Sequence, residues 1–550
     1  MSQSSPPDVT GSSPAPKGFF GVHPLKLVFA FEYVLQGIGN PFQGITYQPF
    51  FGHFTNQFGL SEAATQSYFS RSYLAWSFKP IIGFFIDAYG KTKTILVSTL
   101  ALATLMFLFT PLFDTGPETF FWYMFVLSVL LAATDVAVDR ASVVAGDEEA
   151  AATGKSKAAT VGLNQSISWA AIYGTSIVSA VAGGYVATHT EFHTLMMCLA
   201  AAPLTVLLIV LQLPADVATP IPVWKSVMNF WEGLNTGPIL WIIVFYFMFH
   251  FQPAAGTIWT NYQLDVLKFT QDQAGILDGM SYVGYFIGVV LFAKYGVRWQ
   301  DAIGLKRIFQ LFILLSIGAN LTQYTMLDPW FTRGANLLNT ALPFLDEGQA
   351  RMGWYSLYNV LYFVFMGFTR MSTFSLVGSV IPSNAAGSLF AGFMSVANLA
   401  YSFSYSSGSW LYEHGLEVAL VRTVQQDLFG IPAAAGDNMS MVLLVFIGSI
   451  AFLLSFVASH KLPDRRETLS AEDATTHQIG PRHFAKLGED TLRAVNVGML
   501  VVMATAFSLL FFVAGSDPIQ CVLLSFFGAA FLRKVALDAL YARAGSPSPD

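Results

Sequence analysis

The chain has 550 residues, of which 54% are hydrophobic, 15% aromatic and only 11% charged, with a formal net charge of −6. A soluble domain carries about 25% charged residues because its surface must be hydrated, so this composition excludes a string of water-soluble domains. It also argues against a disordered chain, a basic nucleic-acid-binding face and a disulfide scaffold, since Cys198 and Cys521 are the only cysteines.

Long apolar segments recur along the whole chain. A helix needs about 20 mostly apolar residues to cross about 30 Å of hydrocarbon, whereas β-barrel strands would be much shorter and alternating. Twelve segments precede a charged stretch and two follow it, near residues 26–50, 64–86, 94–113, 119–142, 159–187, 194–213, 237–261, 274–294, 307–326, 353–379, 387–412, 440–459, 496–514 and 518–540. We therefore predict an all-α polytopic membrane protein.

The spans form two groups of six, as expected for a transporter built from two repeats. Residues 1–24 are rich in Ser, Pro and Gly and lack the apolar core of a signal peptide, so we expect a disordered tail. The predicted order is a six-helix half (25–213), a linker (214–236), a second six-helix half (237–460), a charged linker (461–495), two extra transmembrane helices (496–540) and a C-terminal tail (541–550).

Lys and Arg residues concentrate on one side of the predicted membrane, as the short cytoplasmic loops of polytopic proteins do. With the N-terminus inside, that side receives Lys17, Lys26, Lys91, Lys93, Arg140, Lys155, Lys157, Lys225, Lys294, Arg298, Lys306, Arg307, Arg533, Lys534, Arg543 and the cluster from Lys461 to Arg493. The outer side receives Lys268, Arg333, Arg351 and Arg422. We predict that both termini are cytoplasmic and that the protein lies in a bacterial cytoplasmic membrane.

A short turn rich in glycine and lysine follows the second span. It reads Gly83-Phe-Phe-Ile-Asp87-Ala-Tyr-Gly90-Lys91-Thr-Lys93 and resembles the loop 2–3 signature of the major facilitator superfamily. Gly83 allows helices to approach closely, Asp87 can cap or pair at a helix end, and Gly90 permits a tight turn. A positive-inside turn of ordinary kind would explain the same residues, but its place after the second of twelve spans favours the superfamily.

Further stretches are similar to the folate–biopterin transporter family within that superfamily. They are Trp76-Ser-Phe-Lys79-Pro80 before Gly83, Ala133-Thr134-Asp135-Val136-Ala137-Val138-Asp139, Gln252-Pro253 with Tyr262-Gln-Leu-Asp-Val-Leu-Lys268-Phe269, and Ile381-Pro382 leading to Leu389-Phe390-Ala391 and Met394-Ser395-Val396-Ala397-Asn398-Leu399. The resemblance covers about residues 26–460. It implies a 6+6 helix bundle that carries a folate- or pterin-like solute.

The chain departs from that pattern at three places. Arg140 stands where a small apolar residue usually follows the second aspartate, and Ala386 or Gly387 stands near where an acidic residue often follows the proline. The last two spans, 496–540, have no counterpart. Muropeptide permeases and bacteriochlorophyll-associated carriers share parts of the same signatures, so the departures leave the substrate open.

A polar stripe marks the first span. Glu32, Gln36, Asn40 and Gln43 are spaced by 4, 4 and 3 residues, which places them on one face of a continuous helix. Such a stripe in an apolar span must face the bundle interior or a water-filled cavity. We predict that the stripe lines the solute pathway and that Glu32 is the proton-coupling carboxylate.

Two aspartates in the fourth span lie one turn apart. Asp135 and Asp139 share a helix face, and two such carboxylates repel when both are ionised. We expect Asp135 to contact solute or proton, and Asp139, beside Arg140, to help close a cytoplasmic gate. An ion-pair network with Lys79 or Arg71 explains either aspartate equally well.

Two basic residues occupy the second span. Arg71, at mid-span, is predicted to capture a carboxylate of the solute by bidentate hydrogen bonds, with a pair to Glu32 as the alternative. Lys79, next to Pro80, is assigned to the cytoplasmic gate together with Gly83, Asp87, Asp139 and Arg140.

Arg370 in the tenth span is predicted to hold an anionic solute from the second half, with a bond to span eleven or to Glu32 as the alternative. His250 in span seven is a candidate proton relay or a packed core residue. Trp76, Tyr246, Trp259 and Tyr262 could stack on a planar ring, although ordinary packing explains each of them.

Several chemistries have no sequence signature. The chain has no G-x-x-x-x-G-K-[ST] loop, since Gly154-Lys155-Ser156 lacks the preceding glycine, and it has no metal-ligand spacing or catalytic triad pattern. We therefore expect no enzyme activity, no cofactor, no metal and no nucleic-acid partner. The predicted function is proton-coupled transport of a folate- or pterin-like solute in the bilayer. The alternatives are a permease for another anionic or amphiphilic solute, such as a muropeptide, and a non-transporting pigment-delivery or assembly protein.

Overall fold

The structure is a computed structural model of the 550-residue chain. It describes residues 24–154, 157–215, 222–227, 237–296, 298–299, 303–380, 386–414, 436–462 and 489–508, together with isolated positions between 521 and 540. Residues 1–23 of the predicted N-terminal tail, the tail 541–550, most of the linkers 214–236 and 461–495, and most of the second extra span therefore lie outside the described residues.

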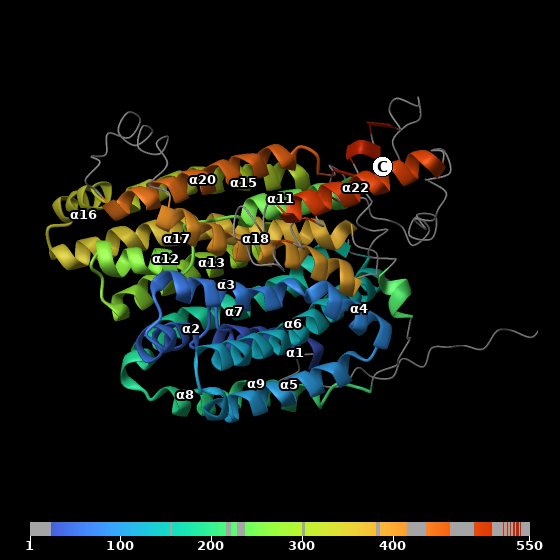
Figure 1. The fold of residues 1–550 in the computed structure, drawn as a ribbon, viewed down its shortest axis with the longest axis horizontal. Helices are drawn as coiled ribbons and strands as arrows, with labels where there is room; N and C mark the ends of the chain where they lie inside the picture. The colour runs from blue at the N-terminus through green and yellow to red at the C-terminus, as the bar shows by residue number, and fades with distance from the viewer. Residues whose placement is uncertain are drawn as a thin grey trace, which may run out of the picture.

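The described part of the chain is helical throughout and contains no strand, which confirms the predicted fold class (Figure 1). The first half consists of α1 (Pro24–Gly39), α2 (Tyr47–Gly52), η2 (His53–Gln57), α3 (Glu62–Ser77), α4 (Lys79–Tyr89), α5 (Thr92–Leu108), η3 (Thr110–Phe113), α6 (Pro117–Thr153), α7 (Lys157–His189), α8 (Phe192–Leu199) and α9 (Ala201–Val210).

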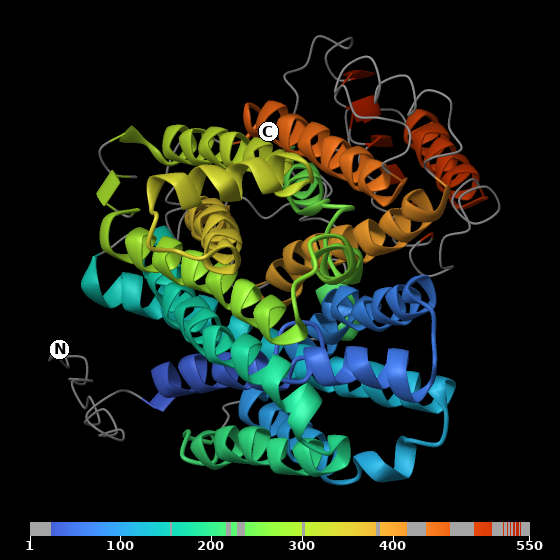
Figure 2. The ribbon, with the colours of Figure 1, turned by 90° about the vertical axis from the view of Figure 1, so that its left-hand side faces the viewer.

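The second half is built in the same manner, and a further helix follows it. Its elements are α11 (Gly237–His250), α12 (Thr257–Asn261), η4 (Tyr262–Val266), α13 (Gln271–Leu291), η5 (Phe292–Gly296), α15 (Leu305–Leu321), η6 (Thr322–Met326), α16 (Trp330–Ala341), α17 (Glu347–Val380), α18 (Ala386–His414), α20 (Gly436–Ser459) and α22 (Glu489–Ser508). Figure 1 shows the two halves as stacked layers of roughly parallel helices, and Figure 2 looks along them.

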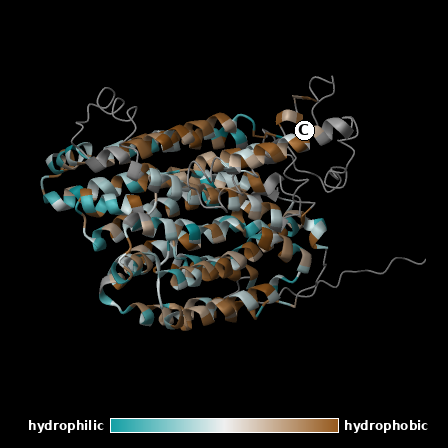
Figure 3. Ribbon diagram, in the orientation of Figure 1, coloured by the Kyte–Doolittle hydropathy of each residue, from teal (hydrophilic) through white to brown (hydrophobic). Residues whose placement is uncertain are grey.

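Seven helical stretches among the described residues are long and apolar enough to cross a bilayer. They are Pro117–Thr153, Thr160–Ala187, Phe192–Val210, Gln271–Gly296, Lys306–Met326, Glu347–Val377 and Met441–Ser459. Apolar residues cover much of the outside of the bundle, as expected for surfaces that face lipid (Figure 3). Other predicted spans are interrupted or contain more polar residues.

The first two spans are each broken into two helices. α1 ends at Gly39 and the chain turns before α2 begins at Tyr47. α3 ends at Ser77, and α4 begins at Lys79 with Pro80 in its first turn, where proline is tolerated because the first backbone N–H groups of a helix have no partner within it. Each break places backbone and polar side chains inside the bundle.

Glycines determine how closely some elements approach. Gly90 ends α4 with a φ of 67°, which confirms the predicted tight turn. α7 and α13 cross with Gly184 and Gly275 in contact, and a Cβ on Gly275 would lie 2.9 Å from the carbonyl oxygen of Ala180. Since α7 and α13 belong to different halves, this crossing joins the two halves near the end of α7 and the start of α13 (Figure 2).

Candidate functional site

Arg370 lies where the two halves meet, and aromatic side chains enclose its guanidinium. Nη1 donates to the Tyr173 hydroxyl at 2.5 Å, and Nη2 donates to the Tyr401 hydroxyl at 3.1 Å. The guanidinium carbon lies 4.9 Å from the Trp169 ring centroid and 5.5 Å from that of Tyr285. We call Arg370 and these four rings the arginine cage.

The cage draws on both halves of the bundle. Tyr173 and Trp169 are on α7, Tyr285 is on α13, and Tyr401 is on α18. The rings of Tyr173 and Tyr285 stack with centroids 4.5 Å apart and planes 6° apart. Because the cage joins the two halves, any change in their relative position alters the surroundings of Arg370.

Arg370 has no carboxylate partner among the described residues. The two other basic residues predicted within spans do have one, since Lys79 pairs with Asp135 and Arg71 pairs with Glu118. The bonds predicted as alternatives for Arg370, to Glu32 or to the span-eleven backbone, are replaced by bonds to tyrosine hydroxyls. The two hydroxyl groups accept from two of the five N–H donors, and within the described ranges the positive charge has no counter-ion.

His250 lies beside the cage at the end of α11. Its Nδ1 lies 2.9 Å from the carbonyl oxygen of Tyr246, and its ring makes an edge contact with Tyr401 at 5.5 Å. The Tyr246 ring stacks on it at 5.3 Å. The structure thus places His250 near Arg370, as part of an aromatic core.

A second polar group lies within the first half. Glu32 accepts a hydrogen bond from Gln36 at 2.7 Å and one from Thr134 at 3.0 Å. Asp139 accepts one from Tyr33 at 2.9 Å and one from Gln165 at 3.1 Å. We call Glu32, Asp135, Asp139 and Lys79 the carboxylate cluster.

All four members of the carboxylate cluster are buried. One oxygen of Glu32 and one of Asp139 have no hydrogen-bond partner among the described residues. Lys79, which also lies 4.9 Å from the Trp76 ring, pairs with Asp135. The structure therefore shows the ion pair between Lys79 and Asp135 that was predicted as an alternative.

The predicted gate residues separate into two groups. Asp87 accepts a bond from Arg140 Nε at 2.9 Å and one from the backbone N–H of Ser388 at 3.0 Å. Arg140 also donates to Thr92 at 3.2 Å. We call these four residues the Asp87 latch. Lys79 and Asp139 belong to the carboxylate cluster instead, so the structure does not bring all the predicted gate residues together.

The latch joins the two halves at the end of the bundle where α4 ends. Ser388 lies in the first turn of α18, where backbone N–H groups lack helical partners and the helix dipole favours a negative charge. Gly83 is buried in α4 one turn before Asp87. The local sequence thus directs the Asp87 carboxylate toward the start of a helix in the other half.

The polar stripe of the first span is shorter than predicted. Asn40 and Gln43 follow the end of α1, so they do not continue the helical face of Glu32 and Gln36. Asn40 is buried, and its Oδ1 accepts a bond from the backbone N–H of Phe42 at 3.0 Å. The expectation of one continuous stripe is wrong because a turn interrupts the span.

Arg71 lies away from both polar groups. Its Nη2 is 3.5 Å from Glu118 at the start of α6, its guanidinium lies over the Phe121 ring at 4.4 Å, and its side chain is 34% exposed. The predicted pair with Glu32 is not formed. Arg71 contacts α6 in its own half, and the structure does not place it with Arg370.

The aromatic side chains predicted to stack on a ring are spread through the bundle. Trp76 contacts Lys79, and Tyr246 contacts His250. Trp259 and Tyr262 stack on each other at 5.8 Å, and the Trp259 indole N–H donates to the Tyr355 hydroxyl. Of these residues, Tyr246 comes nearest to the cage, through its contact with His250.

Several residues that surround Arg370 were not predicted. Tyr173, Tyr285, Tyr401 and Trp169 belong to an aromatic-rich composition in which no single ring stands out. Asp278 in α13 was also missed, although it is an acidic residue inside an apolar span. The rule that selected Glu32 would have found Asp278 as well.

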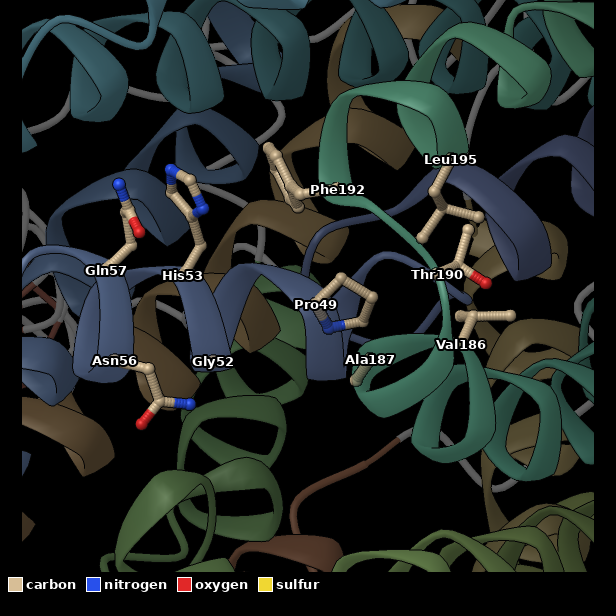
Figure 4. A pocket seen from close by; sticks show the side chains of 10 residues that line it. All are labelled: Pro49, Gly52, His53, Asn56, Gln57, Val186, Ala187, Thr190, Phe192 and Leu195. Carbon is tan, nitrogen blue, oxygen red and sulfur yellow. The ribbon is translucent and has the colours of Figure 1, made fainter.

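A cavity of about 230 Å³ opens beside α2 and α8 (Figure 4), at the opposite end of the bundle from the end of α4 and the latch (Figure 1). Its lining comes from α2, η2, the end of α7 and α8, and consists of Pro49, Gly52, His53, Asn56, Gln57, Val186, Ala187, Thr190, Phe192 and Leu195. None of these is a predicted site residue, and all belong to the first half. The cavity is therefore distinct from the cage at the junction of the halves.

Next to this cavity, Asp114 accepts bonds from two histidines. His53 Nε2 lies 2.9 Å from one of its oxygens and His193 Nε2 lies 2.8 Å from the other. His193 Nδ1 in turn lies 2.9 Å from Glu191. Hydrogen bonds from Thr194 and from the His193 N–H at the start of α8 lower the pKa of Glu191 to about 2. These bonds tie together three segments at this end of the first half.

The chain matches the BT1 family over residues 36–480. A folate-biopterin transporter from Synechocystis sp. is 24% identical over 414 residues, which cover 72% of this chain and 74% of the relative. The family resemblance expected from the sequence is confirmed.

Solved transporter structures share the fold. A D-xylose-proton symporter superposes with a TM-score of 0.54 at 15% identity, over 81% of this chain and 99% of that one. A bacterial homologue of the iron transporter ferroportin and the nucleoside transporter NupG each give a TM-score of 0.50 at 14% identity, over 80% and 79% of this chain and 98% of each of theirs. The chain is therefore a member of the BT1 family, a multi-pass membrane transporter with a major-facilitator fold and not an enzyme.

Proposed function

We propose that this protein is a secondary active transporter that moves an anionic folate- or pterin-like solute by alternating access, coupled to protons. The observation that carries the proposal is the arginine cage. It presents a guanidinium at the junction of the two halves, with no carboxylate partner among the described residues. An unneutralised charge inside the membrane is costly, and such residues mark substrate or ion pathways.

The chemistry of the cage favours a planar anion. A guanidinium binds carboxylates through paired N–H donors, and the surrounding rings offer flat faces on which a heterocycle can stack. Folates combine a planar pteridine with carboxylates. The Synechocystis relative is named a folate-biopterin transporter, which supports the same class of solute.

The carboxylate cluster supports proton coupling. The cluster holds three carboxyl groups and one ammonium group, which pairs with Asp135, so up to two negative charges lack a cation, and binding a proton relieves the repulsion among them. Gln165 donates to Asp139 and accepts from the Trp169 indole N–H at 3.2 Å, and Trp169 lies under Arg370. This path gives the proton-binding group a physical connection to the cage.

Contacts between the halves at several levels support alternating access. The Asp87 latch closes one end. Nearer the middle, Ser70 and Ser402 exchange hydrogen bonds between hydroxyl and carbonyl at 3.1 and 3.0 Å. Gln66 donates to the Tyr405 carbonyl at 3.4 Å. Opening the latch end requires the bond between Asp87 and Ser388 to break, while the bonds of Ser70 with Ser402 and of Gln66 with Tyr405 act as the pivot.

The distribution of Lys and Arg supports a location in the cell membrane with both termini cytoplasmic. In that orientation the latch end of the bundle faces the cytoplasm. The cavity beside His53 then opens toward the outside.

The test is uptake by the purified full chain in proteoliposomes with an imposed pH gradient. We expect accumulation of radiolabelled folate or biopterin above the external concentration when the proton gradient is inward, and none when it is collapsed. Competition by muropeptide tests for a permease of another solute, and competition by tetrapyrrole tests for a pigment-delivery protein. Inhibition by muropeptide without folate or pterin uptake, or the absence of any solute uptake, would contradict the proposal.

A further inference from the structure

Asp278 is an acidic residue within the membrane-spanning part of α13 that the proposed mechanism does not use. No hydrogen bond or ion pair to its carboxylate is found within the described ranges. Asp272 in the same helix differs, because it lies in the exposed first turn. Carboxylates inside spans mark substrate or ion pathways, so one without a partner among the described residues is a candidate for contact with solute.

Asp278 is half-buried on α13, the helix that packs against α7 of the first half. One turn further along α13, Tyr282 stacks on Tyr173 of α7 at 6.4 Å, and the hydroxyl groups of Tyr47 on α2 and Tyr355 on α17 lie within electrostatic range of Asp278. The Tyr47 hydroxyl lies 3.3 Å from the Thr260 hydroxyl on α12, so it bridges the halves. Asp278 is therefore close to the same junction as the arginine cage.

α13 carries a polar face that connects Asp278 with the cage. Asp278, Tyr282 and Tyr285 are spaced by 4 and 3 residues, which aligns them on one side of the helix. Tyr285 lies 5.5 Å from the Arg370 guanidinium. Seven residues of helix separate the two ends of this face by about 10 Å. The carboxylate and the guanidinium thus lie at different depths along one surface.

Buried polar atoms on α2, α12 and η4, the elements that carry or follow the contact between Tyr47 and Thr260, also lack partners among the described residues. Gln48, next to Tyr47, and Asn261, next to Thr260, each have an amide nitrogen without a hydrogen bond among the described residues. Gln263 donates to Tyr355 at 2.7 Å, but its own oxygen has no partner. Buried polar groups normally have hydrogen-bond partners, so these atoms of Gln48, Asn261 and Gln263 can bond to a polar solute.

We propose that Asp278 determines specificity by accepting hydrogen bonds from the donor edge of a heterocycle whose carboxylate end is held by Arg370. A carboxylate matches two parallel N–H donors, and the 2-amino-4-oxo edge of a pteridine presents such a pair, at N3 and the 2-amino group. The inference rests on the proposed function and specifies its substrate class: an elongated solute with a donor-rich ring at one end and an anion at the other.

The test compares folate with its 2-desamino-2-methyl analogue, which keeps the carboxylates and removes the 2-amino donor. Binding of both to the purified full chain is measured for the wild type, D278N and the matched control D272N. The wild type and D272N are expected to prefer folate by about 10- to 100-fold, because a polar site rejects a ligand that leaves its buried groups unpaired. In D278N the preference falls to about threefold or less.

The analogue also reports on folding. D278N should bind the analogue with the affinity of the wild type, because the analogue lacks the 2-amino group that Asp278 would recognise. R370K should lose affinity for both compounds. A wild type that binds neither compound overturns the proposed function itself. The role of Asp278 is overturned if the wild type binds both compounds without preference. It is also overturned if D278N keeps the preference for folate or loses affinity for both compounds equally. None of these outcomes contradicts the role of Arg370.

Discussion

The indole of Trp169 makes two contacts that connect the arginine cage with the carboxylate cluster. Its ring lies 4.9 Å below the guanidinium of Arg370, and its N–H donates to Gln165, which donates to Asp139. The Tyr33 ring, whose hydroxyl donates to the same aspartate, lies 5.6 Å from Trp169. One residue thus touches both the cage and a neighbour of the carboxylate cluster.

Replacing Arg370 by lysine is expected to weaken binding of carboxylate-bearing solutes by about 10- to 100-fold. Lysine keeps the charge but loses the paired donors that hold a carboxylate. Equilibrium binding of folate to the purified protein measures the loss. Arg351→Lys is the matched control, because Arg351 donates to the Leu267 carbonyl outside the cage. Equal losses in both variants would contradict a binding role for Arg370.

Trp169→Phe separates binding from coupling. Phenylalanine keeps a ring under Arg370 but removes the N–H that bonds Gln165. We expect folate affinity within about threefold of the wild type, since a phenylalanine face still attracts the cation, and a smaller dependence of uptake on the proton gradient. Uptake at several imposed gradients measures that dependence. An unchanged gradient dependence would exclude Trp169 from the coupling path.

Glu32→Gln is expected to abolish uphill accumulation while leaving solute exchange intact. The amide is close to the shape of a protonated carboxyl group and can keep the contacts with Gln36 and Thr134, but it cannot release a proton. Counterflow and gradient-driven uptake are compared in the same proteoliposomes. Glu118→Gln, at the half-exposed pair with Arg71, is the control. Full pH-dependent accumulation in the Glu32 variant would exclude it from coupling.

Asp87→Ala is expected to loosen the first turn of α18. The carboxylate accepts the backbone N–H of Ser388 and the Nε of Arg140, so its removal leaves both donors without this partner. Hydrogen exchange followed by mass spectrometry should show faster exchange in residues 386–392. Asp272→Ala should leave this segment unchanged. Equal protection in the two variants would show that the latch does not hold α18.

Arg71→Lys is expected to change substrate preference little. The guanidinium pairs with Glu118 at 3.5 Å and is 34% exposed, and exposed ion pairs contribute about 0–1 kcal/mol. The ratio of folate to biopterin affinity should stay within about twofold of the wild type. A selective loss of folate would restore Arg71 to the binding site.

The sequence was sufficient to predict the helical class, the family and the charged residues worth examining. The length of an apolar segment and the free-energy cost of a charge inside the membrane are local properties, so they can be judged from the sequence without knowing the fold. The same rule would have included Asp278 beside Glu32. The latch was partly predictable as well, because the turn from Gly83 to Lys93 places Asp87 at a helix end.

The partners of those charges were harder to predict, because they depend on which helices cross. Arg71 and Arg370 both appear in the sequence as single arginines within a predicted span. Arg71 pairs with Glu118 at the start of α6 in its own half, whereas Arg370 lies in an aromatic cage between the halves. The break after Gly39 was also missed, since the apolar run continues through it and only the backbone turn at Asn40 reveals it.

The bond between Asp87 and Ser388 joins a side chain to a peptide N–H. Almost any residue can occupy position 388 and still supply that donor, because every amino acid except proline carries it. A substitution at position 388 therefore removes the bond from the Ser388 hydroxyl to Asp87 but keeps the backbone bond between the halves, whereas the α4 side depends on a single carboxylate. The strength of this closure can then be tuned through residue 87 and its neighbour Arg140 without any matching change in the opposite half.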